Sequence, residues 1–261
     1  MSNQIKFVGL HAHSVFSVFD GLGYPQDHID FAIENGMDAL ALTDHGNMNG
    51  LAYQVLHAKK VQKEGKDFKP IFGIEGYFID SVAKWKEEKA EIDENKKGRK
   101  KKELNSAVVI EDEEATKRQE KNILNRRAHL VLLAQNQTGL NNLFTIVSKS
   151  FDPNNFYRYP RIDYEMLREH NEGIIVSSAC MGGPLSKDYW NNREEGDDAV
   201  QRAMVETIEN FTSIFGDRFY GELQWNSIPE QHEINKHIIH AAEKTNIKLI
   251  STADSHYIRQ E

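Results

Sequence analysis

Seven short apolar runs alternate with segments of helical periodicity along this chain, and this alternation constrains the fold more than any other feature. The predicted strands are residues 6–11, 38–43, 70–75, 128–134, 173–178, 219–223 and 247–252. The predicted helices are residues 25–35, 51–64, 139–149, 164–170, 198–215 and 229–245. Strands that alternate with helices pair in parallel, and near-continuous apolar strands are buried on both faces. The pattern therefore predicts an α/β fold, either a barrel or a doubly wound sheet.

Composition narrows the class of protein. The 261 residues suit one large domain or two small ones, and 39% hydrophobic with 28% charged residues is typical of a globular chain. No apolar run reaches 18 residues and no signal peptide is visible, so we expect no membrane association. One cysteine, Cys180, cannot form an internal disulfide, which favours a reducing, cytoplasmic location.

The charge balance bears on possible partners. The net charge of −8 has the wrong sign for a protein that coats nucleic acid electrostatically. It leaves room for an enzyme in which bound metal ions carry the positive charge.

One stretch, residues 81–127, breaks the pattern within the predicted single domain of residues 1–261. It is rich in Lys and Glu and contains the run KKGRKKK at residues 96–102. One interpretation is a solvated or disordered insertion. The other is a basic arm that guides a phosphate backbone, because in a barrel this segment emerges on the catalytic face after the third strand.

Residues able to bind metal gather where the predicted strands end. His11 and His13 occupy positions i and i+2, so both imidazoles point the same way and can reach one ion, and Asp20 follows in the next loop. The same kind of residue accompanies five further strands, at His45, Glu75, His129, Cys180, and the pair Asp254 and His256. Only His129 fits poorly, since it lies near the start of its strand. Nine such residues on six segments are hard to ascribe to packing, and the sequence predicts a metal centre at the carboxyl ends of the strands.

Other polar residues receive other interpretations. Six histidines away from strand ends are expected to lie on the surface or in helix packing, namely His28, His57, His170, His232, His237 and His240. Glu222 ends a strand, but a salt-bridged or solvated role is favoured for it. Asp44 either orients His45 or caps the following helix. Tyr77, Arg161 and Tyr257 are candidates for substrate contacts.

The ordered motifs HAHS, LTDHGN, GIEGY, AHLVLLA, SSACMGG and TADSHY, with Asp20, resemble the polymerase and histidinol phosphatase (PHP) domain. The stretch at residues 221–257 is most similar to the version at the N-terminus of the alpha subunit of bacterial C-family DNA polymerase III. The resemblance covers the chain except residues 81–127. It implies a distorted seven-stranded (βα)₇ barrel, similar to a TIM barrel, with up to three metal ions.

The resemblance also implies a distribution of ligands. His11, His13, Glu75 and Asp254 would hold the first ion, and Glu75 would bridge to a second ion that is completed by His129 and Cys180. Asp20, His45 and His256 would hold the third. Many polymerase versions have lost some of these residues, whereas all nine positions here carry a residue able to bind metal. We therefore expect two to three divalent ions, and the histidines and cysteine favour Zn²⁺, Mn²⁺ or Fe²⁺.

The implied reaction is hydrolysis of a phosphodiester by a hydroxide held between ions, with Glu75 and Asp254 as the catalytic residues. In the family this is a 3′–5′ exonuclease that proofreads DNA, so the 3′ end of a DNA strand is the expected substrate. Two alternatives remain: a catalytically silent structural module, and a phosphomonoesterase of the histidinol phosphatase type.

No paired-aspartate motif for nucleotidyl transfer is visible, and 261 residues leave no room for a polymerase palm domain. The chain alone is not expected to polymerise DNA. It would be either a fragment or a free-standing PHP protein that partners palm and fingers domains in cis or as a separate chain.

Overall fold

The computed structural model describes residues 7–103 and 111–259, and side chains are described outside 98–113. The helices in these ranges are α1 (Pro25–Glu34), α2 (Leu51–Lys63), α3 (Val82–Glu103), α4 (Glu111–Leu124), α5 (Gln137–Ser150), α6 (Tyr164–Glu169), α7 (Pro184–Asn192), α8 (Asp197–Phe215) and α9 (Pro229–Thr245). The strands are β1 (Ala39–Leu42), β2 (Lys69–Phe78), β3 (Ala128–Ala134), β4 (Phe156–Tyr157), β5 (Tyr159–Ile162), β6 (Ile174–Ser177), β7 (Phe219–Gln224) and β8 (Lys248–Thr252). None of the helices in the described part is long and apolar enough to cross a membrane.

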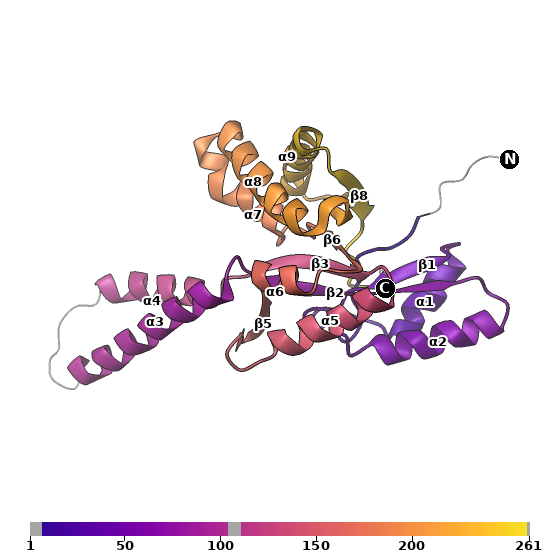
Figure 1. Ribbon diagram of the computed structural model, residues 1–261, viewed down its shortest axis with the longest axis horizontal. Helices are drawn as coiled ribbons and strands as arrows, with labels where there is room; N and C mark the ends of the chain where they lie inside the picture. The colour runs from indigo at the N-terminus through magenta and orange to yellow at the C-terminus, as the bar shows by residue number, and fades with distance from the viewer. Residues whose placement is uncertain (1–6, 104–110, 260–261) are drawn as a thin grey trace.

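The strands form one curled sheet with helices packed outside it (Figure 1). Strand pairing runs from β1 through β2, β3, β6 and β7 to β8. The segment before α1 closes the ring, because Gly9 bridges Leu40 of β1 and Ala12 bridges Ser255 after β8. The α/β barrel interpretation is therefore confirmed. The predicted strand at 6–11 is present only as these isolated bridges, and Lys6 lies outside the described residues.

The prediction of parallel pairing is wrong for one strand of the ring. β3 runs antiparallel to both neighbours, with Glu75 opposite Val131 and Val131 opposite Ser177. Residues 79–127 return the chain to the same end of the barrel, so β3 must descend where its neighbours ascend. The start of β3 therefore lies beside the carboxyl ends of the other strands.

The core forms between the sheet and the outer helices. Helix α8 places Met204, Ile208, Phe211 and Phe215 on one face at helical spacing, and each is almost fully buried. The Phe211 and Phe219 rings stack at 4.9 Å, which joins this helix to β7. This packing fixes the barrel wall and hence the positions of the strand ends.

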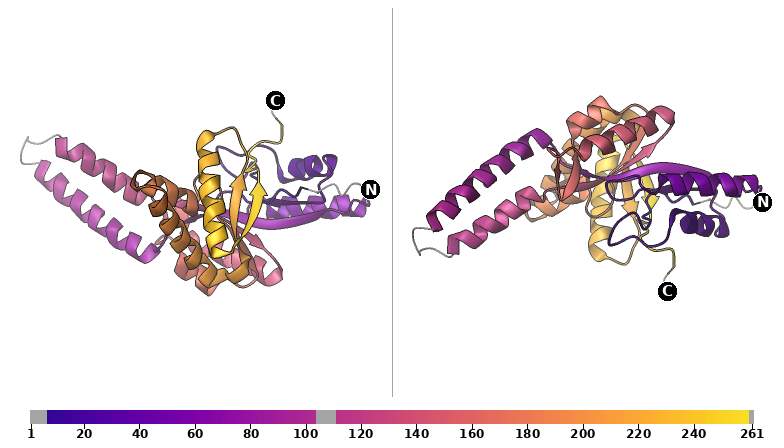
Figure 2. Two further views of the ribbon diagram at one scale, coloured as in Figure 1. Left: turned by 90° about the horizontal axis from the view of Figure 1, so that it is seen from above. Right: turned by 90° about the horizontal axis from the view of Figure 1, so that it is seen from below.

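Within residues 81–127 the described part is the helix pair α3 and α4, here called the helical hairpin, which projects away from the barrel in every view (Figures 1 and 2). Disorder is thus wrong for the described part of this segment, because α3 and α4 lie against each other. Trp85 anchors the base, where it is 1% exposed and its ring lies 4.2 Å from the Arg161 guanidinium. Of the basic run at 96–102, the side chains from 98 onward lie outside the described residues.

Candidate metal centre

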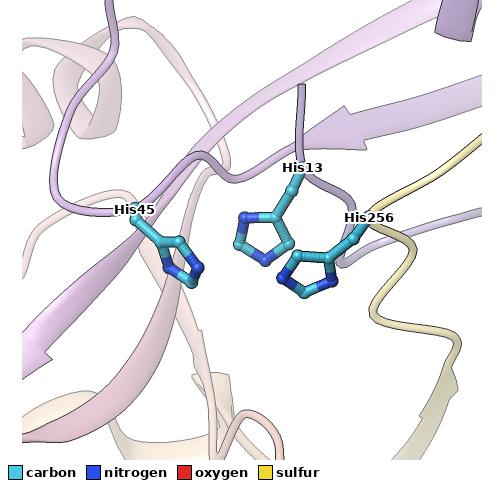
Figure 3. A group of neighbouring side chains, drawn as sticks. All are labelled: His13, His45 and His256. Atoms are coloured by element: carbon cyan, nitrogen blue, oxygen red, sulfur yellow. The ribbon is translucent and has the colours of Figure 1, made fainter. Parts of the chain in front are cut away.

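The nine residues singled out by the sequence meet at one end of the barrel. They come from the segment before α1, the loop after β1, the end of β2, the start of β3, and the loops after β6 and β8. Three overlapping groups could each hold an ion: His13 with His45 and His256, His11 with His13 and Glu75, and His45 with Glu75 and His129. Figure 3 shows the imidazoles of the first group directed toward a common space.

The Glu75 carboxylate lies at the middle of the cluster and is 1% exposed. Its Oε1 lies 3.3 Å from His11 Nε2, 3.0 Å from His129 Nδ1 and 3.7 Å from Cys180 Sγ. Its Oε2 lies 3.7 Å from His13 Nε2 and also contacts His45 Nδ1. One carboxylate thus faces five potential ligands, as a bridging ligand requires.

Asp254 closes the opposite side of the site. Its Oδ1 lies 3.2 Å from both His11 Nε2 and His13 Nε2 and 3.7 Å from His256 Nδ1. The backbone of Asp254 has a φ of 50°, which is rare for a non-glycine residue and is retained where the surrounding structure requires it. This conformation turns the carboxylate back over the barrel end after β8.

Asp20, from the loop before α1, and His129, at the start of β3, complete the cluster. Asp20 Oδ2 lies 3.2 Å from His45 Nε2, although the Asp20 side chain is half exposed. His129 Nδ1 lies 3.5 Å from Cys180 Sγ. The antiparallel direction of β3 explains the misfit of His129, because the start of this strand meets the end of β2.

Five buried polar atoms of the cluster make no hydrogen bond within the part of the chain that the structure describes: His11 Nε2, His13 Nε2, His45 Nδ1, Glu75 Oε2 and Asp254 Oδ1. A buried polar atom without a partner is costly. Imidazole nitrogens and carboxylate oxygens that converge in this way are ligands for divalent transition-metal ions. The residues therefore fit the metal centre that the sequence predicts.

The charges of the cluster depend on one another. Burial alone would raise the pKa of Glu75, but the close imidazoles of His11, His129 and His45 hold it well below its usual range. Burial likewise opposes ionisation of Asp254, yet the charge of His11 and the close contact with the His13 imidazole lower its pKa to about 2. Both carboxylates are thus anionic at neutral pH and available to cations.

Cys180 and His11 behave differently. Burial raises the pKa of the Cys180 thiol well above its usual value, and the carboxylates of Glu75 and Asp254 raise it further. Burial would lower the pKa of His11, but Glu222 and Asp254 raise it well above the ordinary value. A metal ion at this site must therefore displace protons from both side chains.

For Glu222 the solvated alternative is wrong, whereas the salt-bridged alternative agrees with its contact to His11. Glu222 is 1% exposed, and its Oε1 lies 2.7 Å from His11 Nδ1. It also accepts hydrogen bonds from the hydroxyls of Ser177 and Thr252. Glu222 therefore fixes the ring of His11 so that Nε2 faces the cluster. The sequence did carry one signal for this role, because Glu222 lies near the carboxyl end of β7, where other strands also place their site residues.

Asp44 does not cap the following helix α2, whose N-cap is Gly50 without a side-chain hydrogen bond, and it reaches His45 through Ser17. It accepts hydrogen bonds from the Ser14 and Ser17 hydroxyls at 2.8 and 2.9 Å. The Ser17 hydroxyl lies 2.8 Å from His13 Nδ1 and accepts a bond from the His45 backbone amide. Asp44 thus positions two members of the cluster through Ser17, a residue that the sequence did not single out.

Three further predictions concern substrate contacts. The Tyr77 ring lies 6.0 Å from His45 and 5.6 Å from His129, at the edge of the cluster. Tyr257 is exposed beside His256. Arg161 is fully buried and donates to the carbonyls of Tyr157, Tyr159 and Leu124, so its role is structural.

The other histidines remain outside the cluster. His28 is buried and its Nε2 lies 2.9 Å from the Leu22 carbonyl oxygen, as expected for a packing histidine. His57 pairs with Asp30, and His237 contacts Gln201. No metal-binding group among the described residues includes His170, His232 or His240.

Comparison with known proteins gives consistent matches. The chain is 35% identical over 256 residues to DNA polymerase III subunit alpha of Aquifex aeolicus and 32% identical over 263 residues to that of Thermus aquaticus. These matches cover 98% and 100% of the chain, which spans 18% of the length of either relative.

A solved structure described as a metal-dependent phosphoesterase from Bifidobacterium adolescentis shares the fold. The TM-score is 0.53 at 11% identity, with 97% of this chain and 89% of the other covered. Residues 9–226 match the PHP domain family. The chain therefore belongs to the PHP domain family.

Proposed function

We propose that the chain is a metal-dependent phosphodiesterase that acts as a 3′–5′ DNA exonuclease, the proofreading module of a C-family replicative polymerase. One observation carries the proposal: five buried imidazole and carboxylate atoms face one another without hydrogen bonds. The similarity to polymerase alpha subunits supports DNA as the substrate.

The nine residues divide into three ligand sets in this proposal. His11, His13, Glu75 and Asp254 would hold one ion, and His129 and Cys180 would join Glu75 at the second. Asp20, His45 and His256 would hold the third. The chemistry supplied by two to three such ions would be activation of water and neutralisation of charge on the phosphoryl oxygens.

The protein contributes orientation and charge to this reaction. Glu222 keeps Nδ1 of His11 engaged, so that Nε2 is presented to the site. Glu75 and Asp254 are the central catalytic residues because they remain anionic and face both histidines of the HxH pair. The mixture of imidazole, thiol and carboxylate favours Zn²⁺, Mn²⁺ or Fe²⁺.

The proposed setting follows from the relatives. The chain spans less than a fifth of their length, and polymerase palm and fingers domains are its proposed partners in cis or as a separate chain. A cytoplasmic location, where bacterial DNA is replicated, is proposed with them.

A time course on a 3′-labelled DNA strand tests the activity, with the chain loaded with Mn²⁺ or Zn²⁺ and Asp254→Ala in parallel. Stepwise shortening by the wild type and none by the variant is the expected result. A folded, metal-loaded chain that leaves the strand intact would favour a structural module of the polymerase. Faster turnover of a phosphate monoester than of DNA would favour a phosphatase of the histidinol phosphatase type.

A further inference from the structure

A second polar pocket, of about 330 Å³, lies where the base of the α3/α4 hairpin meets α7. The hydrogen bond from the His129 amide to the Gly182 carbonyl, 2.9 Å long, brings these two segments together. The polar residues of its lining include Asp80, Arg126, Arg127, Lys187, Asp188 and Thr207. None of these residues belongs to the metal centre.

Three cations converge on this pocket, and two of them form no ion pair with any residue that the structure describes. Arg126 donates to Glu88 at 2.5 Å, which leaves Arg127 and Lys187. Arg127 stacks on Tyr159 with its guanidinium carbon 3.8 Å from the ring centre, and its Nε is buried without a hydrogen bond. Its Nη1 donates to the Asn125 carbonyl at 3.1 Å. The stacking and this hydrogen bond hold the guanidinium in place, so the donors that remain are oriented in advance for an anion.

The two carboxyl groups of the pocket, Asp80 and Asp188, repel an anion less strongly than two full negative charges would. Burial, together with Asp80 and Glu206, raises the pKa of Asp188 to about 7, and its Oδ2 is buried without a hydrogen bond. Burial and the nearby arginines lower the pKa of Lys187 to about 8. Near neutral pH Lys187 is mostly charged, whereas a protonated Asp188 can donate to an anionic oxygen.

The pocket also lies close to the metal centre. The Arg127 guanidinium is 5.8 Å from the centre of the Tyr77 ring, which in turn lies 5.6 Å from the His129 ring. Lys187 follows Cys180 by only seven residues, on the first turn of α7. A chain with a net charge of −8 needs a local cationic site of this kind to hold a polyanion.

We propose that Arg127 and Lys187 form a subsite for a backbone phosphate of the DNA strand, next to the phosphodiester that lies at the metal centre. This inference rests on the proposed function and names the feature of the substrate that the subsite recognises. It distinguishes a polynucleotide from a small diester, which has no neighbouring phosphate.

The test compares three variants of the full chain. Lys187→Gln removes one charge, Lys187→Arg keeps it, and Lys236→Gln removes an exposed lysine on α9 that pairs only with Glu233 among the described residues. Binding of a labelled single-stranded oligodeoxynucleotide is measured by anisotropy in EDTA at several salt concentrations. Hydrolysis of bis(4-nitrophenyl) phosphate is measured with Mn²⁺.

Lys187→Gln is expected to weaken DNA binding and to reduce the slope of log affinity against log salt by about 0.7, the value for one lost contact to a single strand. Lys187→Arg should restore the slope, and small-diester hydrolysis should stay unchanged in all variants.

A Lys187→Gln slope equal to that of Lys236→Gln overturns the subsite. Equal losses on DNA and on the small diester also overturn it, because they place Lys187 at the cleaved phosphate or in the fold. Failure of the wild type to hydrolyse the small diester would instead contradict the proposed phosphodiesterase, while the binding measurements still decide the subsite.

Discussion

The barrel end and the helical hairpin are both rich in ionisable residues, yet they use them in opposite ways. At the barrel end Glu75 is 1% exposed, and its carboxylate oxygens contact imidazoles from three other segments. On the hairpin Lys89 and Asp93 pair at 2.8 Å in a half-exposed i,i+4 arrangement that stabilises a helix by only about 0.3–0.5 kcal/mol. A high density of charged residues is therefore not enough to form a metal site. The side chains must also be buried away from water and converge on one point.

The attachment of the two regions sharpens this contrast. The hairpin is joined to the barrel mainly through its base, where Trp85 covers Arg161 and the Val82 amide donates to Asp163. The metal-centre residues are instead embedded in the sheet and its loops. The two regions should consequently respond independently to mutation.

The largest effect is expected from Glu75→Gln at the centre of the barrel site. The variant keeps the shape of the side chain but loses the charge that faces five potential ligands. If the ions supply several kcal/mol of transition-state stabilisation, hydrolysis should fall by a factor on the order of 10³. Phosphodiester hydrolysis and metal content by atomic emission are the measurements. A variant that keeps both two ions and full activity would remove Glu75 from the centre of the mechanism.

Glu222→Ala should have the next largest effect, although the residue touches no proposed substrate. Losing the acceptor for His11 Nδ1 is expected to weaken metal affinity by about 10- to 100-fold. Calorimetric titration with Mn²⁺ measures this, and Glu222→Gln, which keeps an acceptor oxygen, should lose less. Equal Mn²⁺ affinity in the wild type and Glu222→Ala would show that Glu222 contributes to packing only and does not orient His11 for metal binding.

Excision of the hairpin tests the independence of the two regions. Phe78 and Ala128 are paired across an antiparallel ladder, so a two-residue Asn-Gly turn can join Ile79 to Arg127. We expect the free energy of unfolding to fall by about 1–3 kcal/mol, because Arg161 loses the Leu124 carbonyl and its ring partner. Metal affinity should change by less than about twofold.

The DNA affinity of the same variant decides between the two interpretations of residues 81–127. Unchanged binding of an oligodeoxynucleotide would exclude the basic-arm hypothesis. A loss of metal binding in a folded variant would contradict the independence of hairpin and barrel.

The smallest effect concerns Asp188, between the two regions. Its pKa is raised to about 7, against about 3.9 in an unfolded chain, so the folded state binds the extra proton. The contribution of Asp188 to stability is therefore lost as pH rises from about 4 through about 7. Asp188→Asn removes this dependence, so its melting temperature should fall less than that of the wild type between pH 5 and pH 8 in EDTA. Parallel melting curves for the two proteins would contradict the buried, proton-binding state of Asp188.

Much of the fold was predictable because short-range patterns are strong here. The predicted strand at 128–134 coincides with β3, and the predicted helix at 229–245 coincides with α9. Both stand out by their apolar periodicity. The hairpin was missed as a helical element because α3 has few apolar residues and its charged pattern is equally typical of a solvated segment.

Most members of the site were also predictable, since they lie beside the ends of predicted strands. The exceptions are Asp20, in a loop, and His129, near the start of its strand. What the sequence could not supply was the direction of β3, and with it the reason that His129 belongs to the cluster. Nor could it separate Glu222 from a solvated carboxylate, because burial depends on the packing of β7 against its neighbours.

The sequence by itself determined the alternation of strands and helices, the residues able to bind metal and the family to which they point. These are properties of residue type and spacing along the chain. Only the tertiary structure decided which polar atoms are deprived of water, which carboxylate orients His11, and that Arg127 and Lys187 line the same pocket. Those features arise from contacts between segments far apart in the chain, and a linear pattern does not encode their distances.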